Sequence, residues 1–305
     1  MIATISEIIS QIVLYTTIYA LVVLGIILSG RTGIFNIAGE GIMLLAASVG
    51  YMSALTTHSW LIGFLAGAAA GGLLGFVLIF IHERLKVDQF ILGISIVILG
   101  AALADLLYKL WFGTQLMVQR APSVPVLTIP LLSRIPLIGG FFRQNVITYF
   151  MYVSLIVSYL FYYRTKKGLE IRAIGENPKS ADVVGINVFK LRYLTTVIGA
   201  VFIGIGGAYL PMILTGSYSF ELTAGRGYMA IGIAIFANWR PQRVLLSAFI
   251  FATFEVLAPQ LQIFFPALPY ELFLLLPFLA ILIIMAIFRK RIEFPAALGD
   301  PYSRE

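Results

Sequence analysis

Residues 8–28 have the sequence IISQIVLYTTIYALVVLGIIL, a run without a single acidic or basic side chain. A bilayer core is about 30 Å thick, so a helix needs about 20 apolar residues to cross it. Because backbone groups in lipid must be satisfied internally, such a run forms a helix. Similar runs continue along the chain, and they predict membrane spans at 8–28, 34–56, 61–80, 90–112, 144–163, 192–214, 222–239, 243–262 and 268–288.

The composition predicts an all-α polytopic membrane protein with about nine transmembrane helices (eight to ten). Hydrophobic residues make up 60% of the chain and charged residues 11%, whereas soluble domains average about 45–50% and about 25%. The runs at 34–56 and 222–239 begin rich in glycine, and we expect them to be broken or re-entrant. The chain has no cysteine, which excludes disulfides and thiol nucleophiles. We expect no catalytic residues, metal site or cofactor in this chain.

Basic residues near the spans predict the orientation of the chain. Segment 164–192 holds seven Lys and Arg residues, so we place it and the basic C-terminal stretch at 289–291 in the cytoplasm. Counting crossings backwards puts the N-terminus and the proline-rich segment 113–143 outside, although three arginines in that segment disagree. The net charge of +7 is therefore explained by orientation rather than by nucleic acid. We interpret the first run as a retained helix, not a signal peptide.

The chain contains an internal repeat. Residues 27–43, ILSGRTGIFNIAGEGIM, align without a gap to residues 213–229, ILTGSYSFELTAGRGYM, with seven identities. By the charge count the helices that lead into the two copies run in opposite directions. Inverted repeats with interrupted helices are typical of transporters. We therefore expect a single permease domain over 1–305, made of two halves at about 1–163 and 164–305.

The two copies carry opposite charges at matching positions, Glu40 and Arg226. A charge at the bilayer centre costs about 2.5–3.5 kcal/mol, so such residues usually pair or face water. We hypothesise that Glu40 and Arg226 pair near the pseudo-symmetry axis; the alternative is that each is solvated separately. Glu255 has no local partner in the sequence, and we expect it to line a polar cavity or to reach a backbone donor. Asp105 and Lys109, four residues apart, should pair on one helix face.

Four aromatic residues in or beside the repeat are candidates to stack on a base or sugar ring: Phe35, Tyr218, Phe220 and Tyr228.

The cytoplasmic segment 166–192, KKGLEIRAIGENPKSADVVGINVFKLR, is polar but contains short helical stretches. A helix through Ile174 can stop at Gly175. Asn177 is a candidate N-cap and Pro178 fits the first turn of a second helix, which Gly185 would end. Such a small helix at the membrane surface is either a docking site for another protein or a solvated connector.

The chain contains no G-x-x-x-x-G-K-[ST] phosphate loop, so ATP-driven transport would need a separate ATPase chain. Three stretches resemble the permeases of the branched-chain amino acid, ribose and nucleoside group of ABC importers, and are most similar to the nucleoside and simple-sugar branch. They are RAIGENPKSADVVGINV (172–188), GIFNIAGEGIMLLAA (33–47) and LTAGRGYMAIGIAIFANWRP (222–241).

The resemblance implies partners: an ATPase subunit that binds ATP and Mg, a second related permease chain, an extracytoplasmic solute-binding protein, and the lipid of the plasma membrane. It implies that the ATPase binds the segment that contains Gly175, Glu176, Asn177, Pro178, Ala181 and Gly185. Together with the aromatic and acidic candidates above, it gives a substrate pathway of Phe35, Asn36, Gly39, Glu40, Gly41, Gly225, Arg226, Gly227, Tyr228 and Glu255. The chain departs from relatives at Ile42, where they often carry Gln, and at Asn238, where they often carry a basic residue.

The expected mechanism is alternating access driven by the partner ATPase. Three alternatives stay open: a branched-chain amino acid permease of the same fold, an ion-coupled carrier that uses Glu40 or Glu255, and a membrane-embedded enzyme. No cluster of catalytic residues in the sequence supports the last.

Overall fold

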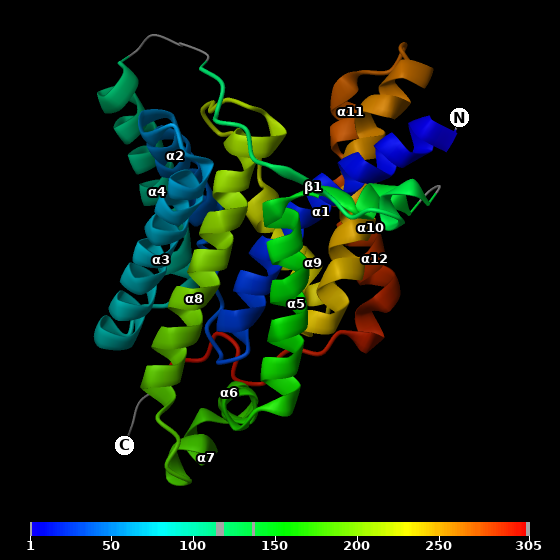
Figure 1. The fold of residues 1–305 in the computed structure, drawn as a ribbon. Helices are drawn as coiled ribbons and strands as arrows, with labels where there is room; N and C mark the ends of the chain where they lie inside the picture. Colours follow the sequence, from blue (N-terminus) through cyan, green and yellow to red (C-terminus); the bar gives the residue numbers. More distant parts are fainter. Residues whose placement is uncertain (1, 114–118, 136–137, 303–305) are drawn as a thin grey trace.

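The computed structural model describes residues 2–113, 119–135 and 138–302 and is almost entirely helical (Figure 1). The first half contains α1 (Ile2–Gly30), α2 (Gly39–Thr57), α3 (Trp60–Leu85), α4 (Gln89–Phe112) and α5 (Val146–Arg164). Two short helices follow, α6 (Lys166–Glu176) and α7 (Pro178–Val183). The second half contains α8 (Val188–Tyr209), the π-helix η3 (Leu210–Leu214), α9 (Arg226–Phe236), α10 (Pro241–Phe264), α11 (Tyr270–Leu274), α12 (Leu276–Phe288) and the 3-10 turn η4 (Arg289–Arg291).

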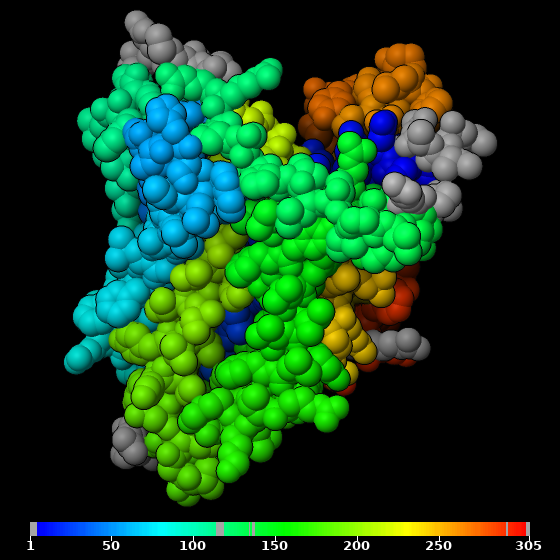
Figure 2. Space-filling model, in the orientation of Figure 1, coloured from blue at the N-terminus to red at the C-terminus, as the bar shows by residue number. Residues whose placement is uncertain are grey.

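Helix α1 lies at the centre of the bundle and packs against α8 and α10. In its most apolar stretch 89% of the residues are buried, against 28% in α4 and 17% in Tyr270–Phe288. Only small areas of α1 show between α5 and α8 in the space-filling view (Figure 2). The contact with α8 depends on small residues, because a Cβ on Gly25 would lie 2.3 Å from the carbonyl oxygen of Gly199. Such close backbone approach is the usual basis of helix association in membranes.

Within the described residues, seven helices are long and apolar enough to cross a membrane. The predicted spans 34–56 and 222–239 are not among them. Residues 39–57 form the largely buried α2. The helix in the second run has only 11 residues, or about 16 Å at 1.5 Å per residue, so it covers about half of a bilayer core. The polytopic helical architecture is therefore confirmed. The described residues contain seven long apolar helices rather than about nine, because these two glycine-led segments are not among them.

The two ends of the bundle differ. Helices α6 and α7 and the C-terminus lie at one end, while the N-terminus, β1 (Val126–Thr128) and α11 lie at the other (Figure 1). Strand β1 pairs antiparallel with β2 (Arg143–Asn145), and the 3-10 turns η1 (Leu132–Arg134) and η2 (Gly139–Phe141) lie between them in the chain. Apart from the last two residues of β2, these elements lie in the proline-rich segment 113–143, for which no membrane span is predicted. Residues 114–118 and 136–137 of that segment fall outside the described residues.

The chain after α12 returns along the α6 end. Ala297 donates its backbone N–H to the carbonyl of Gly175, and Gly299 donates to the carbonyl of Gly33, each at 2.9 Å. Lys86 then donates to the carbonyl of Tyr302 at 2.7 Å. This C-terminal segment therefore joins α6, the α1–α2 connection and the end of α3.

Candidate functional site

Helices α2 and α9 begin next to each other, and the carboxylate of Glu40 joins them. Its Oε2 accepts from the backbone N–H of Gly227 at 2.6 Å. Its Oε1 accepts from the N–H of Gly225 at 2.8 Å and from the hydroxyl of Thr223 at 2.5 Å. The first N–H groups of a helix have no partner in the helix and carry partial positive charge. Glu40, in the first turn of α2, therefore also caps the start of α9, and it is only 6% exposed.

The glycines around Glu40 have different tasks. A Cβ on Gly227 would lie 2.5 Å from the backbone nitrogen of Glu40, so only glycine allows the two helices to meet this closely. Gly225 precedes α9 with φ of 81°, in the left-handed region that favours glycine. Gly39 faces Gly227 with more room, since its Cβ would be 3.8 Å from the nearest atom. Gly41 instead packs against Val97 of α4.

Arg226 pairs with Glu255 of α10 rather than with Glu40. Its Nε donates to Glu255 Oε1 at 2.9 Å, and its Nη2 binds the same oxygen. The hydroxyl of Tyr19 donates to the other carboxylate oxygen. The hypothesised ion pair between Glu40 and Arg226 is not among those of the described residues, although the two segments meet where Gly227 donates to Glu40. Glu255 therefore finds the partner that the sequence did not indicate.

This polar cluster joins the start of α9 to the middle of two long apolar helices. Tyr19 stands well inside α1 and Glu255 well inside α10. The side chains of Arg226 and Glu255 are each 15% exposed, so this chain alone does not enclose the ion pair completely. Ionisable residues inside membrane spans usually mark a substrate or ion pathway. The pair and its surroundings are therefore the candidate substrate site.

One more tyrosine, from α1, completes the surroundings of Arg226. The guanidinium lies over the ring of Tyr15, 5.9 Å from its centroid, and the neighbouring Tyr228 is 46% exposed. Tyr15, Tyr19 and Thr223 were not predicted as site residues. The sequence does show tyrosines, with their polar hydroxyl groups, inside the first apolar run. Periodicity alone does not show which of these side chains contacts a charged residue.

Other predicted pathway residues lie towards the α6 end. Phe35 stacks edge-on against Trp239, which follows α9, with ring centroids 6.1 Å apart. The backbone N–H of Phe35 donates to Gln89 at 2.7 Å. Asn36 is fully buried, and neither polar atom of its amide has a partner among the described residues. These residues belong to the break between α1 and α2.

The candidate stacking residues do not form one group. Tyr218 packs on Tyr51 and Tyr108, with centroids 6.4 Å and 4.8 Å apart. Phe220 is 62% exposed. Asp105 and Lys109 do pair on α4 as predicted, at 2.6 Å.

The segment from Gly175 to Gly185 contains the predicted second helix, but α6 continues through Gly175 and ends at Glu176. Asn177 caps α7 by accepting from the N–H of Ser180 at 3.0 Å, and Pro178 occupies the first turn. Gly185 follows α7 with φ of 87°. Ala181 is buried, while one edge of the segment is exposed: Glu176, Asn177, Lys179, Ser180, Val183, Val184 and Gly185. A compact helical projection therefore stands at this end of the molecule.

This projection is tied to the α1–α2 break at two points. A Cβ on Gly175 would lie 2.4 Å from the carbonyl oxygen of Arg31, so α6 packs directly on the backbone of the break. Arg192, on the second turn of α8, donates to the carbonyl of Thr32 at 3.0 Å. Movement of α6 and α7 would therefore reach the break, and Glu40 lies only eight residues beyond Thr32.

Comparisons with known proteins agree with this arrangement. The family described as branched-chain amino acid transport system permease component matches residues 8–285. The chain is 35% identical to a putative glucose ABC transporter permease, TsgC13, of Haloferax volcanii, over 79% of this chain and 73% of the relative. It is 29% identical to the nucleoside ABC transporter permease NupC of Lactococcus lactis, over 98% and 97%. It is 30% identical to the guanosine ABC transporter permease NupQ of Bacillus subtilis, over 97% of each.

Each of these organisms also contributes a second permease with the same solute in its name, and these are less similar to this chain, at 22%, 24% and 25% identity. No solved structure gives a significant match.

Proposed function

This chain belongs to the family of branched-chain amino acid transport system permease components, and from that premise we propose that it is the membrane-spanning subunit of an ATP-driven importer for nucleosides or simple sugars. The observation that carries the proposal is the exposed α6–α7 projection packed on the α1–α2 break. Through these contacts, a protein that binds and displaces the projection would also displace the α1–α2 break. The names of the three relatives support the solute class.

The proposed assembly contains two permease chains, ATPase subunits and a solute-binding protein. This chain resembles one permease of each pair more than the other, which supports a partner permease that is related but different. The ATPase subunits bind the α6–α7 end and hold the ATP and Mg. That end, with the C-terminus, faces the cytoplasm, and the N-terminal end faces outward across the plasma membrane.

In the proposed mechanism, the ATPase displaces the Gly175–Gly185 segment. Gly175 and Arg192 pass the movement to Arg31 and Thr32, and from there to the start of α2. Because Glu40 binds the N-terminus of α9, α2 and α9 move as one unit. Glu40 therefore acts as a positioning residue, while Arg226, Glu255 and Tyr228 face the solute.

A branched-chain amino acid is the second candidate solute. The family description names it, and a guanidinium beside a carboxylate matches the carboxylate and ammonium groups of an amino acid. A nucleoside or sugar would instead use the same pair through its hydroxyl groups. The two candidates therefore differ in whether the solute brings charged groups or neutral hydroxyl groups to the same ion pair.

Uptake into proteoliposomes that contain both permeases, the ATPase and the binding protein tests the proposal. We expect ATP-dependent uptake of labelled adenosine or ribose, and no uptake when the ATPase is omitted. Exposed Lys109→Gln, on α4, serves as the control variant and should transport normally. Uptake of leucine alone would establish the second candidate, and uptake driven by an ion gradient without the ATPase would refute the importer.

A further inference from the structure

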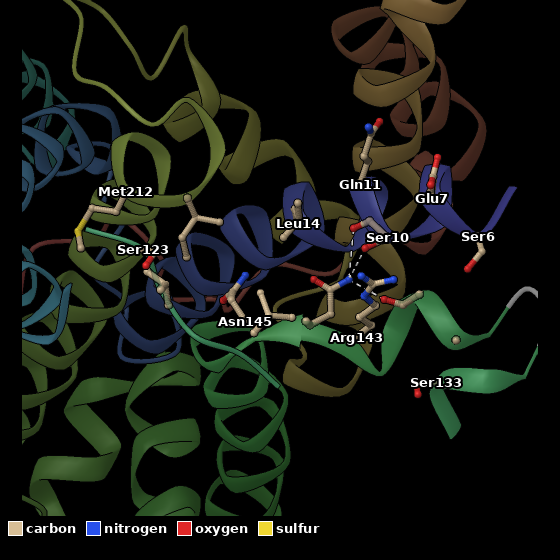
Figure 3. A pocket seen from close by; sticks show the side chains of 16 residues that line it. Ser6, Glu7, Ser10, Gln11, Leu14, Ser123, Ser133, Arg143, Asn145 and Met212 are labelled. Carbon is tan, nitrogen blue, oxygen red and sulfur yellow. Dashed lines mark hydrogen bonds between the residues drawn. The ribbon is translucent and has the colours of Figure 1, made fainter. Parts of the chain in front are cut away.

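A cavity of about 740 Å³ lies beside the start of α1 and strand β2 (Figure 3), at the end of the bundle opposite α6 and α7 (Figure 1). The start of α1, strand β2 and the π-helix η3 form its walls. Four serines line it, Ser6, Ser10, Ser123 and Ser133, together with the amides of Gln11, Gln144 and Asn145. Its volume is in the range of small-molecule sites, which is about 300–1,000 Å³.

Buried amides fix the shape of the cavity. Gln144 is 1% exposed, and its Nε2 donates to Ser10 Oγ at 3.1 Å and to the Gly140 carbonyl at 2.5 Å. Its Oε1 has no hydrogen-bond donor among the described residues. A buried acceptor without a donor is costly. The oxygen is itself enclosed in the cavity wall, so a bound molecule would reach it only if neighbouring side chains shifted.

The lining indicates the class of ligand. Seven of the sixteen lining residues carry hydroxyl or amide groups, five are apolar, and the ionisable side chains are Glu7 and Arg143, one of each sign. The lining residues include no aromatic ring among the described residues, so a nucleobase would find no surface on which to stack. A neutral ring that carries several hydroxyl groups fits this chemistry, as in a monosaccharide or the ribose of a nucleoside.

A chain of buried, hydrogen-bonded side chains runs from the cavity wall into the bundle. Asn145 Nδ2 donates to the hydroxyl of Tyr209 at 2.7 Å, and that hydroxyl lies 3.3 Å from Thr148 Oγ1. Thr148 in turn contacts the hydroxyl of Thr17 at 3.0 Å. Thr17 stands two residues before Tyr19, the partner of Glu255. Met212 and Ile213 of the cavity belong to a π-helix, a distortion often found at functional sites.

We propose that this cavity is an entry subsite that binds the hydroxyl-bearing ring of the solute before the solute reaches Arg226 and Glu255. The inference rests on the proposed function and adds a location and a chemical preference to it. A free nucleobase would not be held there.

The absence of cysteine in the chain provides a direct test. Ser10→Cys and Ser123→Cys introduce single thiols into the cavity wall, and Ser219→Cys, an exposed position that does not line it, is the matched control. Each variant is assembled with its partners in proteoliposomes. The rate of labelling by a membrane-impermeant maleimide is measured alone and with ribose, adenosine, adenine or leucine, and uptake is measured on the same vesicles.

We expect ribose and adenosine to slow labelling of Ser10→Cys and Ser123→Cys about tenfold when present at roughly ten times their Kd, because only about one site in eleven is then free. Adenine should not slow it, and the Ser219→Cys rate should not change. Equal labelling with and without every solute, in vesicles that retain ATP-driven uptake, would overturn the subsite and leave the proposed function intact. Protection by leucine or adenine alone would overturn the ligand class. Loss of the ATPase requirement would instead overturn the proposed function.

Discussion

Arg192 of α8 and Glu83 of α3 form a fully buried ion pair, with Nη1 and Oε1 3.2 Å apart and side chains that are 0% and 3% exposed. Arg192 also holds the carbonyl of Thr32. The pair therefore fixes α8 against α3 at the point where the α6–α7 projection joins the membrane helices.

Removal of Glu83 would leave the guanidinium of Arg192 buried without its carboxylate. We expect Glu83→Ala to lower the free energy of unfolding by about 3–5 kcal/mol, the usual cost of breaking a buried pair. Chemical denaturation of the purified transporter measures it. Glu293→Ala removes a carboxylate that is 71% exposed and pairs with Arg240, and a surface pair is worth about 0–1 kcal/mol. Equal losses for the two variants would contradict this role of Glu83.

The charge of Glu40 should matter more than its size. Glu40→Gln keeps the shape, but its amide NH₂ would face the N–H groups of Gly225 or Gly227 in place of an acceptor. We expect a loss of about 1–3 kcal/mol in unfolding free energy, typical for hydrogen bonds to a charged group, and a strong loss of uptake. Glu271→Gln, on exposed α11, should change neither. Normal uptake by the Glu40→Gln variant would show that transport does not need the charge of Glu40.

A methyl group at the α2–α9 junction should be tolerated on one side only. In Gly227→Ala the added carbon would lie 2.5 Å from the backbone of Glu40, whereas in Gly39→Ala the nearest atom is 3.8 Å away. Overpacking of this kind costs about 1–3 kcal/mol. Thermal unfolding and uptake of the two variants give the comparison. Similar values would show that α2 and α9 do not meet as closely as described.

The local chemistry of the chain predicted the α6–α7 segment well. Asn177, Pro178 and Gly185 act on their own immediate backbone, so a cap, a first turn and a stop follow from neighbours in the sequence. The pair between Arg226 and Glu255 could not be found in this way, because it joins α9 to α10 across 29 positions. The repeat placed Glu40 and Arg226 at matching positions, and the structure brings their two segments into contact. The repeat did not show that backbone N–H groups, rather than Arg226, bind the carboxylate of Glu40.

Hydropathy alone places the start of one helix too early, whereas the glycines at the start of the same run indicated a break there. The apolar run 222–239 has the composition of a span, but Ala224 and Gly225 have positive φ, so the helix starts only at Arg226. Averages over a window count apolar side chains and do not detect a backbone that turns between them.

The ion pair of Arg226 and Glu255 should show strong energetic coupling. A double-mutant cycle with Arg226→Gln and Glu255→Gln is expected to give about 1–3 kcal/mol, as for neighbours in one network. The matched cycle uses Lys109→Gln and Asp105→Asn, whose side chains are 57% and 28% exposed, and helical pairs of that kind give about 0.3–0.5 kcal/mol. Unfolding of the four forms of each pair supplies the values. Additive effects at Arg226 and Glu255 would show that they act independently.

The apolar tip of the α6–α7 projection should decide whether the ATPase binds. Val183 and Val184 are 88% and 74% exposed, beside polar side chains at the same edge. Because Val184 makes little contact within the chain, Val184→Asp should leave stability nearly unchanged, while a charge in an apolar contact should prevent the ATPase from co-purifying and abolish ATP-driven uptake.

Leu169→Asp is the control, because Leu169 of α6 is 60% exposed but lies outside Gly175–Gly185. Pull-down of the ATPase by each variant, with thermal unfolding of the same samples, separates loss of binding from loss of folding. Retention of the ATPase by Val184→Asp would place the docking surface elsewhere, because a carboxylate buried against an apolar partner without a counter-charge cannot be accommodated cheaply.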